Sequence, residues 1–451
     1  MKIVVAGCGK IGSSIVKYLV NEGHSVTVID EDENLLNDFI TSYDVGAIVG
    51  NAAYVSTQQE ANVSRCSIFI AVTGNDELNL VSSRVAKSLG AKKTIARVRD
   101  TEYTDQSDLL KESFDIDMII NPELTTAKEI FNILRFPFAK SVSAFENGKA
   151  VSVEIKVPED CEISNKSVKD LMTEFDRKII FAGILRDDEL IIPNGESVVL
   201  SGDRINIISS PKNIDEFFKK AGIFNQKVTS VFIVGGSRIS FHLARMLSED
   251  GVDVKIIERD EQRCKLLTQS LTGAVEIVKA DGTNEQILDE EGISTYSACV
   301  ALTNHDEENI LVSLYAKTHS VETIITKINN DRLNDILNEL GISTRIQPRR
   351  VTVNHILYFT RVMRAKEENT IERLRKTMND KMEILEFNVN SSEDFTGKSI
   401  KELSIKNGIL LASIIRRGKA IVPSGDVVID GDDKIIIATK TNVKSLDRIL
   451  K

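Results

Sequence analysis

Short apolar runs alternate with amphipathic stretches at the start of the chain. Val, Ile and Ala dominate runs at residues 2–6, 25–29, 67–72 and 94–98. Between the first two runs, apolar residues recur at helical spacing from Ile11 to Leu19, and Gly23 ends the pattern. A helix is also expected to begin near Asn75. Buried strands that alternate with helices predict a parallel sheet with right-handed crossovers. We therefore expect a Rossmann-like, doubly wound α/β domain.

The same pattern occurs a second time. Val26–Asp30 is matched by Val254–Glu258, and Phe69–Glu77 is matched by Cys299–Glu307. The offset is 228 at the acid (258 minus 30) and 230 at the threonine (303 minus 73). Because the offset changes by only two residues over that distance, the chain is interpreted as a tandem duplication.

A smaller repeated unit follows each Rossmann-like part. Asn165–Leu171 resembles Gly397–Leu403, and Ile192–Asp203 resembles Val422–Asp432. Strands at 150–157 and 204–209 around a short helix at 168–175 predict a small α+β domain. We expect four domains: a Rossmann-like nucleotide-binding domain at 1–140, a small α+β domain at 141–222, a second Rossmann-like domain at 228–366 and a second small domain at 367–451.

Composition narrows the function classes. The 451 residues include 57 Lys and Arg against 67 Asp and Glu, a net charge of -10 without a basic run, which disfavours nucleic acid as a partner. The five cysteines and five histidines are scattered, without a Cys-x-x-Cys or His-Glu-x-x-His motif, so no metal site is expected. No uncharged apolar run approaches the length of a membrane span, and we expect a cytoplasmic protein.

A glycine-rich loop follows the first predicted strand and opens the first helix. It reads Gly7, Cys8, Gly9, Lys10, Ile11 and Gly12. In the pattern Gly-x-Gly-x-x-Gly, the first glycine permits a tight turn, the second lets backbone amides approach a pyrophosphate, and the third lets the helix lie close to the strand. The helix N-terminus then faces the phosphates. The alternative, a glycine turn without a ligand, fits this context less well.

An acid ends the second strand, 18 residues after the loop (30 minus 12). Asp30 can accept hydrogen bonds from a ribose hydroxyl and would repel a 2'-phosphate. This favours NAD(H) or an adenine nucleotide, such as ATP or ADP, over NADP(H).

Further candidates stand at the carboxyl ends of the next strands, which face the ligand crevice in such sheets. Thr73 and Gly74 are candidates to line the nucleotide, whereas Asn75 equally fits a helix N-cap. Arg97 lies in an apolar strand and needs an anionic partner. A phosphate, or a carboxylate of Asp100 or Asp117, would meet that need.

The second copy has a changed loop but keeps the other positions. Its loop has serines at the second and third glycine positions, so a purely structural role is as plausible as ligand binding there. The second-copy candidates for a cofactor site are Gly235, Gly236, Ser237, Arg238, Ile239, Glu258, Asp281, Thr303, Asn304 and Lys327. Asn51 and Ala52 are the candidates that correspond to the turn of Asp281 in the first copy.

The duplicated motifs resemble the TrkA family of potassium-uptake proteins, whose RCK (KTN) domains are followed by TrkA-C domains. The resemblance covers essentially the whole chain. It rests on the glycine loop, the strand ending in Asp30, the segment Val72–Asn79 and the Pro-Asn-Gly…Gly-Asp pattern of the small domains. Where the family has Gly-Asp-Ala or Gly-Asp-Thr, this chain has Gly50, Asn51 and Ala52 in the first copy and keeps Asp281 in the second.

The resemblance implies a function. Such proteins are peripheral regulatory subunits on the inner face of the cell membrane, without enzymatic activity. They form a ring, here expected to be a homotetramer, and control a membrane-embedded potassium transporter subunit of the TrkH/TrkG kind. An NAD-dependent oxidoreductase is the alternative, but the predicted small domains contain no histidine that could serve as a proton donor.

Overall fold

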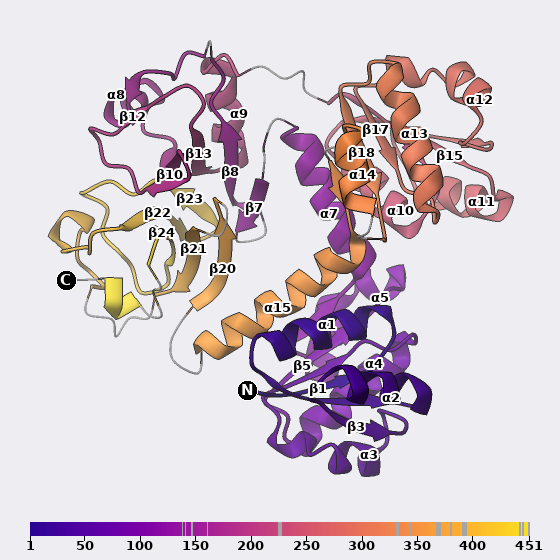
Figure 1. The fold of residues 1–451 in the computed structure, drawn as a ribbon. Helices are drawn as coiled ribbons and strands as arrows, with labels where there is room; N and C mark the ends of the chain where they lie inside the picture. Colours follow the sequence, from indigo (N-terminus) through magenta and orange to yellow (C-terminus); the bar gives the residue numbers. More distant parts are fainter. Residues whose placement is uncertain are drawn as a thin grey trace. The chain divides into compact units, whose positions relative to one another are not determined.

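The computed structural model folds into two compact units (Figure 1). Unit 1 comprises Met1–Arg135 and Lys227–Leu357, and unit 2 comprises Phe136–Gln226 and Tyr358–Lys451. The structure describes residues 1–137, 139, 141–145, 148–159, 161–223, 228–330, 333–342, 344–366, 371–378, 381–389, 395–441, 443 and 446–449. The predicted boundary at 366/367 adjoins 367–370, which lie outside the described residues. Each unit therefore combines one domain from each half of the chain.

The first Rossmann domain has a six-stranded parallel sheet in the order β3-β2-β1-β4-β5-β6. This is the order of a doubly wound dinucleotide-binding fold, as the sequence predicts. Its strands are β1 (Lys2–Ala6), β2 (Ser25–Asp30), β3 (Gly46–Val49), β4 (Ile68–Ala71), β5 (Lys93–Arg97) and β6 (Met118–Ile120). Its helices are α1 (Lys10–Asn21), α2 (Glu33–Ser42), α3 (Val55–Glu60), the 3-10 turn Val63–Arg65, α4 (Asp76–Leu89), α5 (Thr101–Asp105), α6 (Ser107–Phe114) and α7 (Pro122–Arg135).

The second Rossmann domain repeats this order as β16-β15-β14-β17-β18-β19, again parallel. Its strands are β14 (Ser230–Val234), β15 (Asp253–Glu258), β16 (Val275–Lys279), β17 (Ala298–Ala301), β18 (Thr323–Lys327) and β19 (Arg345–Ile346). Its helices are α10 (Arg238–Glu249), α11 (Glu261–Ser270), α12 (Glu285–Glu290), the 3-10 turn Ile293–Thr295, α13 (Asp306–Thr318), α14 (Asn334–Glu339) and α15 (Pro348–Lys366). The duplication read from the sequence is therefore a duplication of topology.

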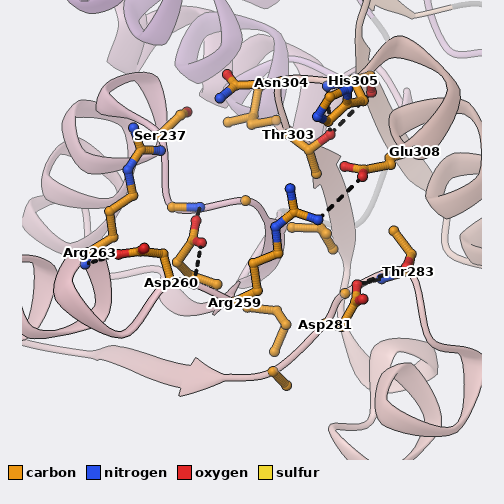
Figure 2. Close-up of a pocket in the computed structure, with 18 residues that line it drawn as sticks. Ser237, Arg259, Asp260, Arg263, Asp281, Thr283, Thr303, Asn304, His305 and Glu308 are labelled. Carbon is orange, nitrogen blue, oxygen red and sulfur yellow. Dashed lines mark hydrogen bonds and ion pairs between the residues drawn. The ribbon is translucent and has the colours of Figure 1, made fainter.

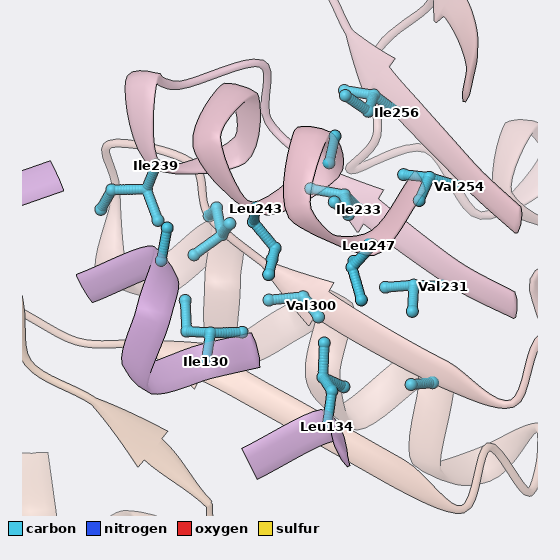
Figure 3. Packing of buried hydrophobic residues seen from close by; sticks show 14 of the residues in the cluster. Ile130, Leu134, Val231, Ile233, Ile239, Leu243, Leu247, Val254, Ile256 and Val300 are labelled. Atoms are coloured by element: carbon cyan, nitrogen blue, oxygen red, sulfur yellow. The ribbon is translucent and has the colours of Figure 1, made fainter. Parts of the chain in front are cut away.

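Helix α7 completes the core of the other Rossmann domain. Its residues Ala127, Ile130 and Leu134 are buried in one apolar cluster with Val231 and Val300 of the second sheet (Figure 3). The spacing of Ala127, Ile130 and Leu134 predicts one apolar face on this helix, and such a face needs a partner surface. The partner is the second half of the same chain, so α7 gives no support to self-association.

In unit 2, the first small domain has an antiparallel sheet in the order β11-β10-β13-β8-β7. Its elements are β7 (Ser141–Phe145), β8 (Ala150–Lys156), β9 (Lys166–Ser167), α8 (Val168–Glu174), β10 (Ile180–Arg186), β11 (Glu189–Ile191), β12 (Val198–Val199), β13 (Arg204–Ser209) and α9 (Pro211–Lys220). β9 and β12 pair separately with each other. The strands and helix predicted for this α+β domain are thus present.

The second small domain has the sheet order β20-β21-β24-β22-β23. Its strands are β20 (Ile371–Thr377), β21 (Met382–Asn388), β22 (Ile409–Arg416), β23 (Lys419–Ile421) and β24 (Lys434–Thr439). Its described helical segments are the 3-10 turns Ile400–Glu402 and Leu446–Ile449. The two small domains share an apolar core that includes Phe145, Ile180, Met382 and Ile436.

Hydrogen bonds to a buried ion pair of the first small domain join the two small domains. The carboxylate of Glu154 on β8 pairs with Arg204 and accepts a 2.8 Å hydrogen bond from Thr377 Oγ1 on β20. Burial acts to raise the pKa of Glu154, but the hydrogen bonds from Arg204, Thr377 and the Met378 amide together hold this pKa below its usual value. A charge in a core needs such partners, so this network fixes how the two sheets meet.

Candidate functional site

Glycine is needed at the three positions of the first loop for different physical reasons. A Cβ at Gly7, whose φ is +99°, would lie 2.8 Å from the Thr73 nitrogen, and a Cβ at Gly12 would lie 1.8 Å from the Gly7 oxygen. At Gly9 no atom lies within 4 Å of a built Cβ. The fold therefore requires Gly7 and Gly12, whereas the space above Gly9 is open. A phosphate group needs that space to reach the helix N-terminus.

Asp30 lies against this loop. Its Oδ2 accepts a 2.6 Å hydrogen bond from the Cys8 amide, and its Oδ1 accepts a 3.0 Å bond from the Asp32 amide. A carboxylate has about four acceptor positions, so two remain for ribose hydroxyls. The sequence predicts a carboxylate that binds the ribose at this position, and the structure places the Asp30 carboxylate beside the loop.

Cys8 is packed inside the loop as a small apolar residue. Burial, with the nearby Asp30 carboxylate, raises the pKa of its thiol to about 12. The thiol is therefore protonated and unreactive at neutral pH. Lys10 and Ile11 lie at the start of α1, on the side of the loop that faces the second Rossmann domain.

The end of β4 is fixed by a buried asparagine. Asn79 Oδ1 accepts 2.8 Å hydrogen bonds from the Thr73 amide and the Thr73 hydroxyl, and its Nδ2 donates to the Arg97 carbonyl at 2.9 Å. Asn75 caps α4 by accepting from the Leu78 amide at 2.6 Å, so the N-cap interpretation is confirmed. No atom lies within 4 Å of a Cβ built at Gly74.

Asn51 keeps the turn after β3 although it replaces the family's aspartate. Its Oδ1 accepts from the Ala53 amide at 2.9 Å, and its Nδ2 donates to Glu31 Oε1 at 2.9 Å. The second copy forms the same turn when Asp281 accepts from the Thr283 amide at 3.0 Å. These bonds hold the pKa of Asp281 below its usual value. Ala52 is buried.

Arg97 has no carboxylate partner among the described residues. Its Nη1 donates to the Thr73 carbonyl at 3.1 Å, and its buried Nε has no hydrogen-bond acceptor in the described structure. Asp117 instead accepts from Lys87 at 2.7 Å, and Asp100 caps α5 through the Glu102 amide. Of the two alternatives for Arg97, pairing with one of these two carboxylates is wrong, and pairing with a phosphate stays a prediction.

The second copy forms a pocket of about 280 Å³ (Figure 2). Among the residues predicted from the sequence it brings together Gly235, Gly236, Ser237, Glu258, Asp281, Thr303 and Asn304. The pocket lies at the carboxyl ends of β14, β15 and β17, where a doubly wound sheet binds its ligand.

The second loop keeps its turn and its helix start although two of its glycine positions hold serine. Ser237 caps α10 by accepting from the Ser240 amide at 3.3 Å. Ser240 Oγ donates to the Gly235 carbonyl at 2.5 Å, so a hydrogen bond replaces the close contact that Gly12 makes in the first loop. Glu258 repeats the role of Asp30, because it accepts from the Gly236 amide at 2.6 Å and the Asp260 amide at 2.8 Å.

A second cavity, which we call the loop cleft, lies between the two glycine loops inside unit 1 and has a volume of about 580 Å³. It is lined by seven cationic side chains and one carboxylate: Lys10, Arg97, Arg99, Arg238, Arg263, Lys327, Arg349 and Glu123. Glu123 is already paired with Arg99. The cleft therefore presents excess positive charge.

Lys327 is the most confined of these cations, with 6% of its surface exposed. Burial lowers the pKa of its ammonium group, although Asp306 opposes the shift. Across the residues that the structure describes, Lys327 makes no ion pair. A buried unpaired cation is costly, so the site favours an anionic ligand.

Buried polar residues outside the predicted set hold the site in shape. Asn309 Oδ1 accepts from the Thr303 amide at 2.8 Å, as Asn79 does in the first copy. Asp76 accepts from the Arg99 amide at 2.8 Å, and Asp306 accepts from the Asn329 amide at 2.9 Å. Their presence at matching positions of both halves was a usable signal, because buried polar residues need a partner.

The described residues contain neither a metal-binding cluster nor a membrane-spanning helix. No cluster of three or more His, Cys, Asp or Glu side chains with metal-binding geometry occurs in that part of the chain. None of its helices has the length and apolar character required to cross a bilayer.

Comparison with known proteins matches the whole chain. Residues 3–122 and 231–348 match the TrkA-N domain, and residues 153–222 and 384–451 match the TrkA-C domain. The Trk system potassium uptake protein TrkA homolog of Archaeoglobus fulgidus is 32% identical over 453 residues, covering all of both chains. TrkA homolog 2 of Methanosarcina mazei is 29% identical over 460 residues, again covering all of both chains.

The fold also matches a solved structure. The GsuK channel bound to NAD superposes with a TM-score of 0.64 at 17% identity. The match covers 97% of this chain and 76% of that chain. At this level of identity the likeness concerns the fold.

Proposed function

Because the chain belongs to the TrkA family, we propose that it is the nucleotide-binding regulatory subunit of a Trk-type potassium uptake system. The observation that carries the proposal is the pair of acids pinned to the two glycine loops. Asp30 binds the Cys8 amide and Glu258 binds the Gly236 amide, both at 2.6 Å. Each loop therefore has a carboxylate in position to bind a ribose, so the chain has the residues needed to bind two nucleotides.

The ligand we propose is NAD(H), with ATP or ADP as further adenine nucleotides. An acid at the end of β2 suits an unmodified ribose and disfavours a 2'-phosphate. The structural neighbour GsuK carries NAD on the same fold, which supports the assignment. Arg97 and Lys327 stand at equivalent strand ends and would balance phosphate charge.

The loop cleft offers a physical route from nucleotide to transporter. Lys10 and Arg238 begin the two loop helices and both line the cleft. Phosphates at either loop would reduce the repulsion between these cations and so favour a closer packing of the two domains. A ligand changes such an equilibrium only through its different affinity for the two states.

The partners belong to the same proposal. The protein would assemble into a ring, expected to be a homotetramer, on the cytoplasmic face of a membrane-embedded potassium transporter subunit of the TrkH/TrkG kind. We propose no catalytic residue. The predicted small domains contain no histidine to donate a proton beside a nicotinamide, which disfavours the oxidoreductase alternative.

Calorimetry with NADH, ATP and ADP tests the binding step. The wild-type chain should bind, and Asp30→Ala should weaken binding at the first site by about 1–2 kcal/mol, as for a lost charged hydrogen bond. Absence of binding at millimolar ligand would overturn nucleotide regulation. Steady NADH oxidation with carbonyl substrates, lost in Asp30→Ala, would favour the dehydrogenase instead.

Potassium uptake tests the regulatory step. Cells lacking the protein should take up potassium more slowly, and the Asp30→Ala, Glu258→Ala double variant should fail to restore uptake. A Lys265→Ala variant changes an exposed residue outside both pockets and should restore it. Unchanged uptake in the deleted cells would refute the proposed partner, and a monomer in light scattering would refute the ring.

A further inference from the structure

The two Rossmann domains differ in charge close to the glycine loop. The second pocket is lined by Arg259 and Arg263. With the offset of 228 that relates Glu258 to Asp30, the equivalent residues of the first half are Glu31 and Leu35. The second site thus has two cations where the first has an anion and an apolar side chain.

Only one of the two arginines is free to meet a ligand. Arg259 Nη1 lies 3.6 Å from Glu308 Oε1, and this ion pair crosses the pocket (Figure 2). Asp281 adds a second negative charge near Arg259. For the Arg263 side chain, the described part of the chain offers no ion-pair partner, so its charge is not compensated.

The backbone places Arg263 in a fixed position. Its amide donates to Asp260 Oδ1 at 2.8 Å, which caps α11 and fixes the first helical turn. Figure 2 shows the side chain extending from this turn toward Ser237 on the glycine loop. Arg263 also lines the loop cleft together with Arg238 and Lys327. It therefore stands where the second pocket continues into the cationic cleft.

The first site lacks this feature. Leu35 follows Asp32, which caps α2, and is 38% exposed. Glu31, which accepts from Asn51 Nδ2 at 2.9 Å, places a carboxylate where the second half has the Arg259 guanidinium. A ligand with more phosphate charge than a dinucleotide gains no matching cation from these positions.

We propose that Arg263 makes the second site selective for a nucleoside triphosphate, whereas the first site prefers a dinucleotide; this inference rests on the proposed nucleotide-binding function. A guanidinium binds phosphate oxygens in a bidentate way, and the bond strengthens with phosphate charge. A triphosphate has a terminal phosphate with free oxygens. Both phosphates of NAD are esterified and carry one charge each. Arg263 is therefore a specificity-determining residue.

The test measures the second site alone. In the full chain, the Gly9→Val side chain would fill the open space that a phosphate needs at the first loop, so it blocks binding there. The fold should tolerate the change, because a Cβ at this position meets no protein atom within 4 Å. Calorimetry in this background then compares ATP, ADP and NADH. Arg263→Leu, which installs the first-half residue, should weaken ATP binding by roughly tenfold to a hundredfold, ADP binding less, and NADH binding by less than about threefold. Arg263→Lys should retain part of the ATP affinity.

Matched variants separate a specific role from general charge. Lys265→Leu removes a cation from the same helix, but Lys265 pairs with Glu261 and does not line the pocket. It should leave ATP affinity unchanged. In a Glu258→Ala background, Leu35→Arg should raise the ATP affinity of the first site relative to NADH.

The outcomes are distinguishable. Equal loss of ATP and NADH affinity in Arg263→Leu, or unchanged ATP affinity, would overturn the role of Arg263 while leaving the proposed function intact. Failure of the wild-type chain to bind any of the three nucleotides would overturn both. A loss of ATP affinity in Lys265→Leu equal to that in Arg263→Leu would show a long-range charge effect and would also overturn the assignment.

Discussion

At the scale of single residues, the first loop separates glycines required by the fold from a glycine required by a ligand. A built Cβ at Gly12 lies 1.8 Å from a carbonyl oxygen of the same loop, whereas one at Gly9 meets nothing within 4 Å. Gly9 also has an ordinary extended conformation, with φ at -62°. A Cβ at Gly9 therefore meets no protein atom and would collide only with a bound phosphate.

We therefore expect Gly9→Val to abolish nucleotide binding at the first site while lowering the free energy of unfolding by no more than about 1 kcal/mol, a typical cost for an unsuitable N-cap. Gly12→Val should destabilise unit 1 by about 3 kcal/mol or more, because a backbone atom cannot move out of the way. Thermal unfolding and calorimetry measure both effects. Similar stability losses in the two variants would contradict this division.

The cysteines give a second test at this scale. Four of the five are buried, and burial raises the pKa of Cys66 and Cys299 to about 12. Cys161 is partly exposed. A thiol reagent at neutral pH should therefore modify Cys161 alone in the native protein, and all five thiols after denaturation. Labelling that persists in Cys161→Ser would show that another thiol is accessible.

At the scale of elements, the contact between α7 and α10 decides how the two Rossmann domains pack. His242 on α10 is fully buried, and neither of its ring nitrogens has a hydrogen-bond partner in the described structure. Burial, followed by the charge of Arg245, lowers its pKa to about 4. Lys128 lowers the pKa further, whereas Asp105 and Glu123 raise it. A neutral imidazole is thus built into this contact.

Protonation of His242 should make the free energy of unfolding fall as the pH is lowered. Because the pKa of His242 is about 4 in the fold and 6.5 in the unfolded chain, the unfolded state alone binds the proton between these values. The contribution of neutral His242 to the free energy of unfolding is fully present above pH 6.5. It falls as the pH drops toward 4, by about 3 kcal/mol in total. Denaturation of His242→Leu should show a correspondingly smaller loss over this range. An unchanged slope would exclude His242 as its source.

At the scale of the whole molecule, the two halves share a topology but differ at the loops. Ser237 puts a side chain where Gly9 leaves open space, so a pyrophosphate should bind the second loop less closely. Arg238 at the start of α10 offsets part of that loss through its charge. The first half should therefore hold the tighter dinucleotide site.

Single variants that leave one site intact test this asymmetry. NADH should bind more weakly to Asp30→Ala, in which only the second site is intact, than to Glu258→Ala, in which only the first site is intact. Calorimetry on the full chain measures both affinities. Equal affinities would mean that the loop substitutions do not control dinucleotide binding.

The sequence alone was sufficient for the duplication, the parallel sheets implied by alternating strands and helices, and the two loops with their acids. These features depend on local periodicity and on short motifs, such as the strand and loop from Lys2 to Gly12, whose physical causes lie within a few residues. The N-cap at Asn75 was likewise readable, because capping is a local hydrogen bond.

Only the tertiary structure decided which residues meet across long distances. Ile130 packs with Val231 and Val300 in a core built from both halves, and no periodicity states which surface an apolar face will cover. Arg97 is left without a carboxylate because Asp117 lies beside two lysines instead. Packing also decides the roles of the buried asparagines Asn79 and Asn309 and of the cations in the loop cleft. Burial and pairing are properties of the folded chain and cannot be read from sequence spacing.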